Sequence, residues 1–386
     1  MHQNYLLTLI LCLLVHFCSF GQIRQVYLDN DGANAVQKIS FYSPSEGYVA
    51  FKKWIGFTTD SGRTMSRIYI TNTNVNYNGY SVDLTFGFGI SGVKAFDRNT
   101  LIAYGDYGFA PAILSSGDGG TTWKLIFLAP LDPVNFSAGV TDLVFPQNDN
   151  IGYATYVNGI LKTTDKGNTW SVQLIATGSY FDHIEAADDN NVIAMSTGAG
   201  TFGTNKVLKT INGGASWDKL PIPVQGTIKL DYAYFLNSTT GWLSFLDQNQ
   251  KVYFYKTTTA GGVWQQLNDN DATPFSCSKM HFVDENTGYA LVGFDVYKTL
   301  NGGVTWEPLP RPAVVPDQGG DNDIQCLSPT QLWAGGDHGF LGLSANGGGT
   351  PLPTAWFKVD TSGVFATGRV SLLNYSRPGY QYQWLV

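Results

Sequence analysis

Seven positions in the chain carry side chains that could take part in acid–base or binding chemistry. Each lies three residues before a recurring anchor position, which is phenylalanine in most repeats. In chain order the seven are Lys38, Val93, Asp142, His183, Tyr232, Lys279 and Asp323, and six of them are polar or titratable. Asp182, Glu185 and Asp231 lie nearby in the same segments.

These residues suggest two kinds of chemistry. A glycoside hydrolase uses one carboxylic acid with a raised pKa opposite a second carboxylate, and the candidate catalytic acids are Asp142, Glu185, Asp231 and Asp323. A binding ring at one mouth of a channel would instead use Lys38, His183, Tyr232 and Lys279. The preferred interpretation is simpler: positions that face a water-filled channel are polar without a specific role, and no carboxylate pair stands out.

An eight-residue pattern, Ser/Thr-x-Asp/Asn-x-Gly-x-Thr/Ser-Trp, recurs along the chain and sets the elements that carry these residues. It is complete from Ser116, Thr163, Thr210 and Thr299, and degraded from Thr58, Thr257 and Ser344. Its glycines fall at positions 62, 120, 167, 214, 261, 303 and 348, at intervals of 58, 47, 47, 47, 42 and 45 residues. The characteristic side chains are Asp60, Asp118, Asp165, Asn212, Asn301 and Asn346, with Trp123, Trp170, Trp217, Trp264 and Trp306 closing the octets.

The chemistry of the octet is that of a hydrogen-bonded hairpin. The Asp or Asn oxygen can accept backbone N–H bonds across its own turn, and the glycine supplies a positive φ. The tryptophan can pack on apolar surface while its indole N–H finds a partner. We therefore assign the octet residues a structural role.

A second motif, an anchor followed by Gly and an aromatic residue, precedes most octets. It reads Phe41…Gly47-Tyr48, Phe145…Gly152-Tyr153, Phe235…Gly241-Trp242 and Phe282…Gly288-Tyr289. Each repeat then contains four antiparallel strands, which is the size of one β-propeller blade. The sequence predicts an all-β fold, a seven-bladed propeller. Pro351 ends the last octet and Pro353 lies where the next strand should begin, so we expect residues 23–28 to form the outer strand of the seventh blade and close the ring.

The octets resemble the Asp-box (BNR) repeats of sialidases, sortilin-type propellers and some glycoside hydrolases. The longer unit, best seen at Gly288-Tyr289 and Thr299 to Trp306, resembles photosystem II stability and assembly factor-like propellers. The resemblance covers residues 29–350 and implies boxes on peripheral hairpins, away from the ligand face. A sialidase would need an arginine triad, which the few arginines of this chain do not supply.

The two ends of the chain read differently from the repeats. Residues 1–21 have the pattern of a signal peptide, so we expect a secreted or cell-surface protein with no membrane span after cleavage. Residues 22–353 form the propeller. Residues 354–386 resemble the start of a PKD or Ig-like β-sandwich, which suggests a fragment of a longer multidomain protein. Cys277 and Cys326 either form a disulfide or are two buried thiols.

Composition and motif content exclude several classes of function. The chain has 44 glycines, and its net charge of −7 gives no electrostatic footprint for nucleic acid. It contains no phosphate-binding loop and no metal-binding spacing of His or Cys, so neither cofactor nor metal is expected. We predict a monomeric, non-catalytic extracellular module that binds a glycan or an extracellular protein. The alternative is a glycoside hydrolase acting on extracellular polysaccharide.

Overall fold

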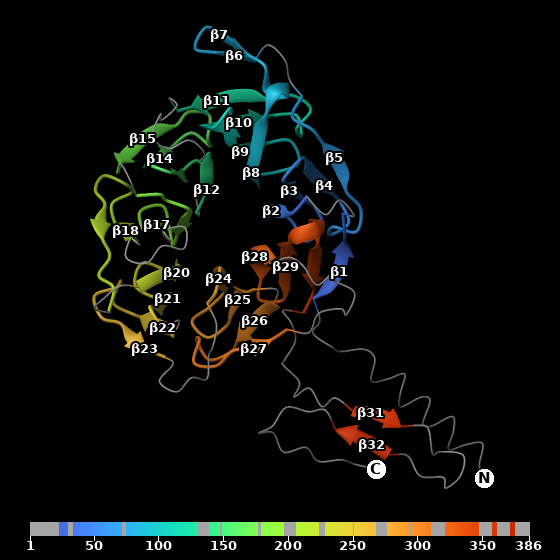
Figure 1. Cartoon of the computed structure of the whole chain (residues 1–386). Helices are drawn as coiled ribbons and strands as arrows, with labels where there is room; N and C mark the ends of the chain where they lie inside the picture. Colours follow the sequence, from blue (N-terminus) through green and yellow to red (C-terminus); the bar gives the residue numbers. More distant parts are fainter. Residues whose placement is uncertain are drawn as a thin grey trace, which may run out of the picture.

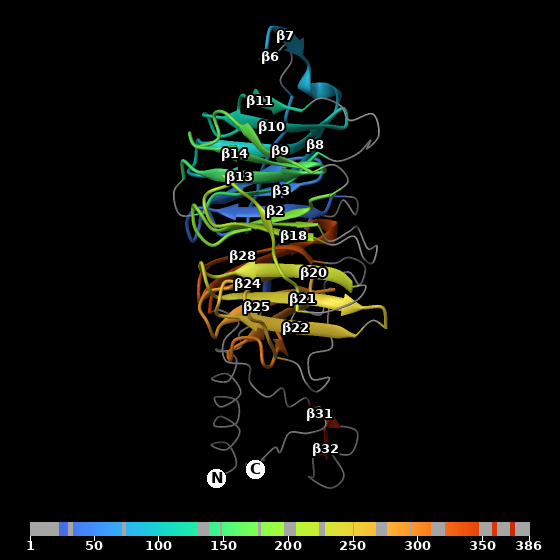
Figure 2. The same ribbon diagram turned by 90° about the vertical axis from the view of Figure 1, so that its left-hand side faces the viewer.

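The computed structural model is a seven-bladed β-propeller in which seven four-stranded antiparallel sheets surround a central axis (Figure 1). Figure 2 shows the propeller edge-on, and the β6–β7 hairpin projects beyond the blades. The structure describes residues 23–29, 34–71, 75–129, 139–146, 149–176, 179–196, 206–223, 228–249, 251–267, 276–293, 295–309, 321–346, 357–360 and 371–374. The predicted all-β propeller is confirmed.

Each blade runs from an innermost to an outermost strand in chain order, except the last. Blade 1 is β2 (Val36–Phe41), β3 (Gly47–Phe51), β4 (Ile55–Thr58) and β5 (Ser66–Ile68). Blade 2 is β8 (Phe88–Ala95), β9 (Leu101–Tyr107), β10 (Ala110–Ser116) and β11 (Lys124–Leu128). Blade 3 is β12 (Val140–Val144), β13 (Gly152–Tyr156), β14 (Gly159–Thr163) and β15 (Ser171–Ile175). Blade 4 is β16 (His183–Ala186), β17 (Val192–Ser196), β18 (Lys206–Thr210) and β19 (Asp218–Lys219).

The remaining blades follow the same order. Blade 5 is β20 (Ile228–Phe235), β21 (Gly241–Asp247), β22 (Val252–Thr257) and β23 (Gln265–Gln266). Blade 6 is β24 (Lys279–Phe282), β25 (Gly288–Val292), β26 (Asp295–Thr299) and β27 (Glu307–Pro308). Blade 7 is β28 (Asp321–Ser328), β29 (Gln331–Gly336), β30 (Leu341–Ser344) and, from the other end of the chain, β1 (Arg24–Tyr27).

Ring closure takes place in blade 7, where β1 pairs with β30 in antiparallel register. Arg24 lies opposite Leu343 and Tyr27 opposite Leu341, and the side chain of Ile23 is fully buried. Figure 1 shows the blue β1 beside the orange strands of blade 7. The predicted closing strand at residues 23–28 is therefore confirmed.

The Phe…Gly-aromatic motif has a packing explanation. Phe41, Phe235 and Phe282 lie directly opposite Gly47, Gly241 and Gly288 across the first strand pair of their blades. A Cβ added at any of these glycines would come within 2.5–2.6 Å of the phenylalanine ring. The phenylalanine ring therefore covers the glycine, and a larger residue at the glycine position would displace that side chain.

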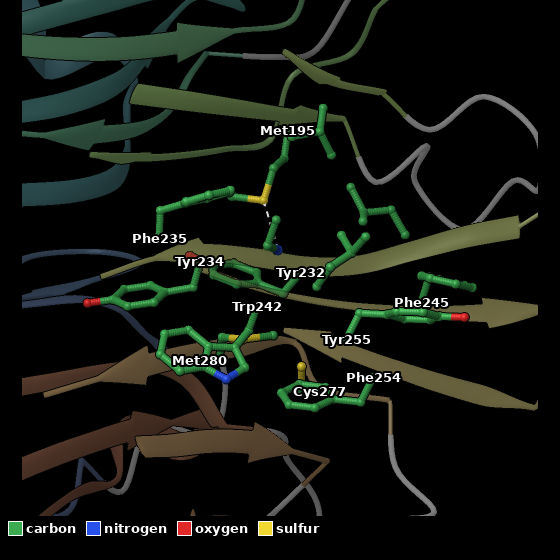
Figure 3. Packing of buried hydrophobic residues seen from close by; sticks show 14 of the residues in the cluster. Met195, Tyr232, Tyr234, Phe235, Trp242, Phe245, Phe254, Tyr255, Cys277 and Met280 are labelled. Carbon is green, nitrogen blue, oxygen red and sulfur yellow. Dashed lines mark hydrogen bonds between the residues drawn. The ribbon is translucent and has the colours of Figure 1, made fainter. Parts of the chain in front are cut away.

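The aromatic residue after the glycine links neighbouring blades. The hydroxyl groups of Tyr48, Tyr153 and Tyr289 donate to the backbone oxygens of Arg98, Asp189 and Pro329 in the next blade. Trp242 donates in the same sense to Gly302 at 2.8 Å. Figure 3 shows Trp242 within the packed side chains of blade 5, with Met195 of blade 4 and Met280 of blade 6 on its two sides.

The octets form the expected hairpins between the third and fourth strands. In blade 3 the Thr163 hydroxyl donates to Asp165 (2.7 Å) and accepts the N–H of Gly167 (3.0 Å). Asp165 also accepts the N–H and the hydroxyl of Thr169, at 2.9 and 2.7 Å. The bond from the first hydroxyl to Asp or Asn, and the bond from the later N–H, recur in the octets that begin at Thr58, Ser116, Thr210 and Thr299. In the two Asn octets the side-chain amide donates to the hydroxyl of Ser216 or Thr305. The structural role assigned to the octets follows from this network.

The predicted indole partners occur in only some octets. Trp170 donates to Gly167 and Trp264 to Pro221, at 3.1 and 3.0 Å. The indole N–H groups of Trp123 and Trp217 have no hydrogen-bond partner among the described residues. For these two tryptophans the prediction of a hydrogen-bond partner was wrong, and apolar packing alone holds the indole ring.

The long interval of 58 residues contains an element that the repeat did not predict. The hairpin of β6 (Val75–Tyr77) and β7 (Tyr80–Val82) is inserted between blades 1 and 2. Its turn, Asn78-Gly79, has positive φ at both residues (51° and 85°), as a two-residue hairpin turn requires. The Asn-Gly pair between Tyr77 and Tyr80 was an available signal that the repeat obscured.

The two cysteines and the C-terminal region bear on the remaining predictions. Cys277 and Cys326 are both free thiols, so the disulfide alternative was wrong. In the C-terminal region β31 (Phe357–Asp360) pairs with β32 (Ser371–Asn374), where strands were expected, but the predicted sandwich remains a prediction. The signal peptide, the tract 198–203 and the predicted strand 380–384 lie outside the described residues. Within the described part of the chain, no helix is long and apolar enough to span a bilayer.

Candidate functional site: the inner-strand ring

The seven aligned positions all fall on innermost strands and share one register. In five blades the position pairs with the residue three places after the start of the second strand, as seen for Lys38 with Ala50, His183 with Met195 and Lys279 with Leu291. In five blades (β2, β8, β12, β20 and β28) a register shift lies immediately before or at this level. A bulge re-aims the side chain that follows it. The seven aligned positions therefore lie at one level of the innermost strands, and their role stays a prediction.

Asp142 is the centre of one half of the ring. Its carboxylate accepts the Lys38 ammonium at 2.6 Å, and the His183 Nδ1 lies 3.9 Å from its second oxygen. Lys38 belongs to blade 1 and Asp142 to blade 3, so this ion pair joins two blades that are separated by blade 2 in chain order. Burial opposes ionisation of Asp142, but the Lys38 charge and the nearby His183 outweigh it and hold the pKa of this carboxyl well below its usual range.

The same pair fixes the charge of the lysine. Burial disfavours the ammonium form of Lys38, but the carboxylates of Asp142 and Asp323 outweigh this cost and raise its pKa well above the usual value. Both partners are therefore charged at neutral pH. A charge-assisted hydrogen bond of this kind is short and strong when both groups are largely removed from water.

Asp323 has an equivalent position in blade 7. It accepts the Lys279 ammonium at 2.5 Å and, through its second oxygen, the backbone N–H of Ile39 in blade 1 at 2.7 Å. Asp142 likewise accepts the backbone N–H of Ile184 in blade 4 at 3.4 Å. In both cases the aspartate binds the N–H two residues before the anchor of the following blade.

That N–H belongs to an open sheet edge, because the innermost strand of a blade has a partner on one side only. Unpaired backbone groups at such an edge need another partner. Other side chains meet the same need: Gln325 accepts the N–H of Phe41, Ser40 that of Ala95, and the Met195 sulphur that of Ala233 (Figure 3). The ring aspartates thus belong to a wider set of side chains that cover the inner edge of the next blade.

Glu185 has a different environment. Its carboxylate accepts the Tyr232 hydroxyl of blade 5 at 2.5 Å, and the Tyr232 ring lies 5.1 Å from the His183 ring. Burial raises the pKa of Glu185, and the nearby Lys279 charge only partly opposes this. Burial, followed by the Glu185 charge, raises the pKa of Tyr232 well above its usual value. The pair therefore joins blades 4 and 5 through a hydroxyl donor and a carboxylate.

Asp231 lies in the bulge beside Tyr232 and makes contacts with hydroxyl groups. Ser276 donates to it at 2.7 Å and Ser244 at 3.2 Å. Burial raises the pKa of Asp231, since these neutral donors do not compensate fully for the lost water. Glu185 and Asp231 are thus the two acids of the ring region with raised pKa values.

The arrangement supports inter-blade linkage better than hydrolysis. The four candidate acids lie in blades 3, 4, 5 and 7, and each is bound to a neighbouring strand, blade or connection. Two of them, Asp142 and Asp323, are bound to lysine ammonium groups and to edge N–H groups. The described residues contain no cluster of His, Cys, Asp or Glu that could hold a metal ion.

The sequence reading missed a set of lysines that precede the octets. Lys162, Lys209 and Lys256 donate to the backbone oxygens of Gly213, Ala260 and Glu285 in the following blade, at 2.5, 3.3 and 3.1 Å. Their ammonium groups also lie over the rings of Tyr153, Phe235 and Trp242, at 4.5–5.4 Å from the centroids. The recurring Lys-Thr dipeptide at the start of four octets was the available signal.

Comparison with known proteins places the fold. A structure of YCF48 from Cyanidioschyzon merolae superposes with a TM-score of 0.60 at 17% identity, covering 84% of this chain and 98% of that one. A structure of YCF48 bound to a D1 peptide gives 0.58 at 18% identity, covering 84% and 99%. This chain is a seven-bladed propeller that resembles YCF48. The likeness to photosystem II assembly factor-like propellers is confirmed for the fold.

A second group of relatives consists of GH74 propellers. The GH74 xyloglucanase of Xanthomonas campestris has a TM-score of 0.56 at 13% identity, with 80% of this chain and 52% of that chain covered. In sequence, xyloglucanase Xgh74A of Acetivibrio thermocellus is 26% identical over 187 residues, which is 44% of this chain. The match spans only 19% of that curated relative's length. No family model matches the chain.

Proposed function

We propose that the protein is an exported, non-catalytic propeller module that binds a protein partner. The observation that carries this proposal is the use of the ring acids: Asp142 and Asp323 are each bound both to a lysine and to the inner edge of the next blade. Acids held in this way stabilise the ring and are not available as a general acid and a base. The YCF48 structure with a bound D1 peptide shows a propeller of this shape with a peptide ligand.

Other parts of the proposal rest on the sequence. Export depends on the leader at residues 1–21, and attachment to further extracellular domains depends on the PKD-like segment after residue 353. The octets have the hydrogen bonds expected of Asp-box repeats, and this supports the Asp-box relationship.

A second function, hydrolysis of an extracellular polysaccharide, has two specific observations in its favour. The chain matches part of a xyloglucanase, and Glu185 and Asp231 have the raised pKa values that a general acid needs. These two acids, rather than the ion-paired Asp142 and Asp323, would then be the catalytic candidates.

The test combines turnover with binding. Xyloglucan and a panel of other polysaccharides are incubated with the protein, and reducing ends are compared with those from the Glu185→Gln and Asp231→Asn variants. The same protein is applied to a peptide array and to a glycan array. We expect peptide binding and no turnover. Turnover that one of these two substitutions abolishes would overturn the proposal, and binding to glycans alone would exclude the protein partner.

A further inference from the structure

We propose that the turn between β9 and β10 of blade 2 binds an arginine side chain of a polypeptide partner through the Phe109 ring and the Asp106 carboxylate. The inference rests on the proposed binding function and names the chemistry of one contact with the partner. This turn joins the second and third strands of its blade, so it lies at the opposite end of the blade from the octet hairpin, which joins the third and fourth strands.

The backbone of Phe109 has an unfavourable conformation. The β9–β10 hairpin turns through two residues, Gly108 and Phe109, whose φ angles are 55° and 71°. A two-residue turn of this kind requires positive φ at both positions and therefore favours Asn-Gly. The β6–β7 hairpin has that pair, Asn78-Gly79, with φ angles of 51° and 85°. Phenylalanine at the position of the glycine is strained, and strain that a folded protein keeps points to a function.

The Phe109 side chain does not contribute to the core in return for this strain. It is 62% exposed, more than any other aromatic side chain that the structure describes. A single exposed apolar residue is ordinary on a protein surface, but one held in a strained turn where glycine would fit better is not. The exposed ring itself is therefore the feature that the strain preserves.

Asp106 borders the same turn. Its Oδ1 accepts the backbone N–H of Phe109 at 3.3 Å, so the carboxylate lies next to the residue that carries the exposed ring. The space for this carboxylate comes from Gly89, which lies opposite Asp106 in β8, because a Cβ at that glycine would clash with Asp106 Oδ2. Among the described residues Oδ2 has no hydrogen-bond donor, and Asp106 takes part in no ion pair.

The surroundings of Asp106 leave its charge without compensation. Burial raises the pKa of this carboxyl, and the N–H of Phe109 is the group that opposes the rise. The nearby Asp83 differs, because it accepts the N–H and the hydroxyl of Thr85 at 3.0 and 2.6 Å. A partly buried carboxylate that has an accessible oxygen and no basic neighbour favours a cationic ligand.

Blade 1 contains the same arrangement with an arginine of its own. The guanidinium carbon of Arg67 lies 4.7 Å from the centroid of the Trp54 ring, and the guanidinium binds Asp29 at 3.3 Å. A planar guanidinium can stack on an aromatic ring while its N–H groups reach a carboxylate. Phe109 and Asp106 supply the ring and the carboxylate, but no lysine or arginine of the described residues lies over the Phe109 ring. An arginine of the partner would complete the set.

The test compares the wild type with Phe109→Gly, which removes the ring, and with Asp106→Asn, which removes the charge and keeps an acceptor for the Phe109 N–H. The probe is the tripeptide acetyl-Gly-Arg-Gly-amide, titrated by saturation-transfer difference NMR at low and high salt. The same tripeptide with citrulline in place of arginine keeps the shape without the charge, and cellobiose is the saccharide probe. Asp247→Asn is the matched control, because Asp247 accepts backbone N–H groups at the corresponding turn of blade 5.

We expect the arginine peptide to bind the wild type and Asp247→Asn equally. Loss of the charged acceptor in Asp106→Asn should weaken binding about tenfold, and loss of the ring in Phe109→Gly about threefold. Binding should fall with added salt and as the pH is lowered through the pKa of Asp106. Phe109→Gly should also unfold at a higher urea concentration than the wild type, because the strained residue is gone.

Several results would overturn the proposal: equal binding of the citrulline peptide, unchanged affinity in either site variant, binding of cellobiose instead of the arginine peptide, no binding to the wild type, or a destabilised Phe109→Gly protein. The peptide array that tests the proposed function is repeated with Phe109→Gly. Capture of the same peptides by this variant and by the wild type would overturn this site and leave the proposed function standing. An array on which the wild type captures no peptide would overturn both.

Discussion

At the scale of single residues, Asp142 and Asp323 perform the same task in different blades. Each binds a lysine through one oxygen and the edge N–H of the next blade through the other. The sequence placed both residues at one level of the ring, because their spacing from the anchor is the same. It could not show their partners: Lys38 lies 104 residues from Asp142, and Ile39 lies 284 residues from Asp323.

Glu185 gives a pH-dependent prediction at this scale. Its pKa is raised in the folded protein, so its contribution to stability is present below the pKa of the unfolded chain and is lost as pH rises through the folded value. We expect Glu185→Gln to stabilise the protein at pH 7, by about 1.4 kcal/mol for each unit by which folding raises the Glu185 pKa, and to have little effect at pH 4. Urea unfolding at the two pH values measures this. A destabilised variant at pH 7 would show that the Tyr232 hydrogen bond outweighs the cost of burial.

At the scale of elements, the octet hairpin depends on one carboxylate that accepts several hydrogen bonds. Asp118 accepts the Ser116 hydroxyl and both the N–H and hydroxyl of Thr122, at 2.6–2.8 Å. We expect Asp118→Ala to lower the free energy of unfolding by about 1–2 kcal/mol, which is the usual cost of losing such a cap. Thermal unfolding measures this, with T121S as a control in the same hairpin. An unchanged free energy of unfolding would show that the hydrogen bonds to Asp118 do not stabilise the hairpin.

The glycine beneath the anchor ring provides a second prediction for an element. A Cβ at Gly288 would lie 2.5 Å from the Phe282 ring, in a pair where the ring also stacks on Trp242 at 3.5 Å. We expect Gly288→Ala to cost about 1–3 kcal/mol through overpacking, measured by chemical unfolding. The exposed Gly117, with nothing within 4 Å of an added Cβ, is the matched site, and Gly117→Ala should have a much smaller effect.

The elements also show how far the sequence can predict this fold. The glycine intervals and the two motifs were sufficient for seven blades, their strand order and the ring positions, because each repeat carries its own turn chemistry. The β6–β7 hairpin was missed because only one blade contains it, and the repeat was the basis of the reading. The lysine bonds to the next blade were missed because a local motif does not show a contact between repeats.

At the scale of the whole molecule, the ring is closed by a strand from the other end of the chain. β1 completes blade 7, buries Ile23 and continues to Asp29, which binds Asn34 at 2.7 Å and Arg67 at 3.3 Å in blade 1. We expect deletion of residues 22–28 to lower the free energy of unfolding by about 3 kcal/mol or more, since the loss of one buried isoleucine already costs 2–5 kcal/mol. Deletion of residues 1–21 alone is the control, and equal stability of the two truncated proteins would contradict this closure.

The central claim is that the polar ring holds the blades together rather than carrying out chemistry. Its most direct test is equilibrium urea unfolding of Asp142→Asn beside the wild type at pH 7. Because this change leaves the largely buried Lys38 ammonium without its carboxylate, we predict a loss of about 3 kcal/mol in the free energy of unfolding. Residues kept for catalysis commonly cost stability, and their removal leaves it unchanged or raises it. An Asp142→Asn protein as stable as the wild type, or more stable, would contradict the account.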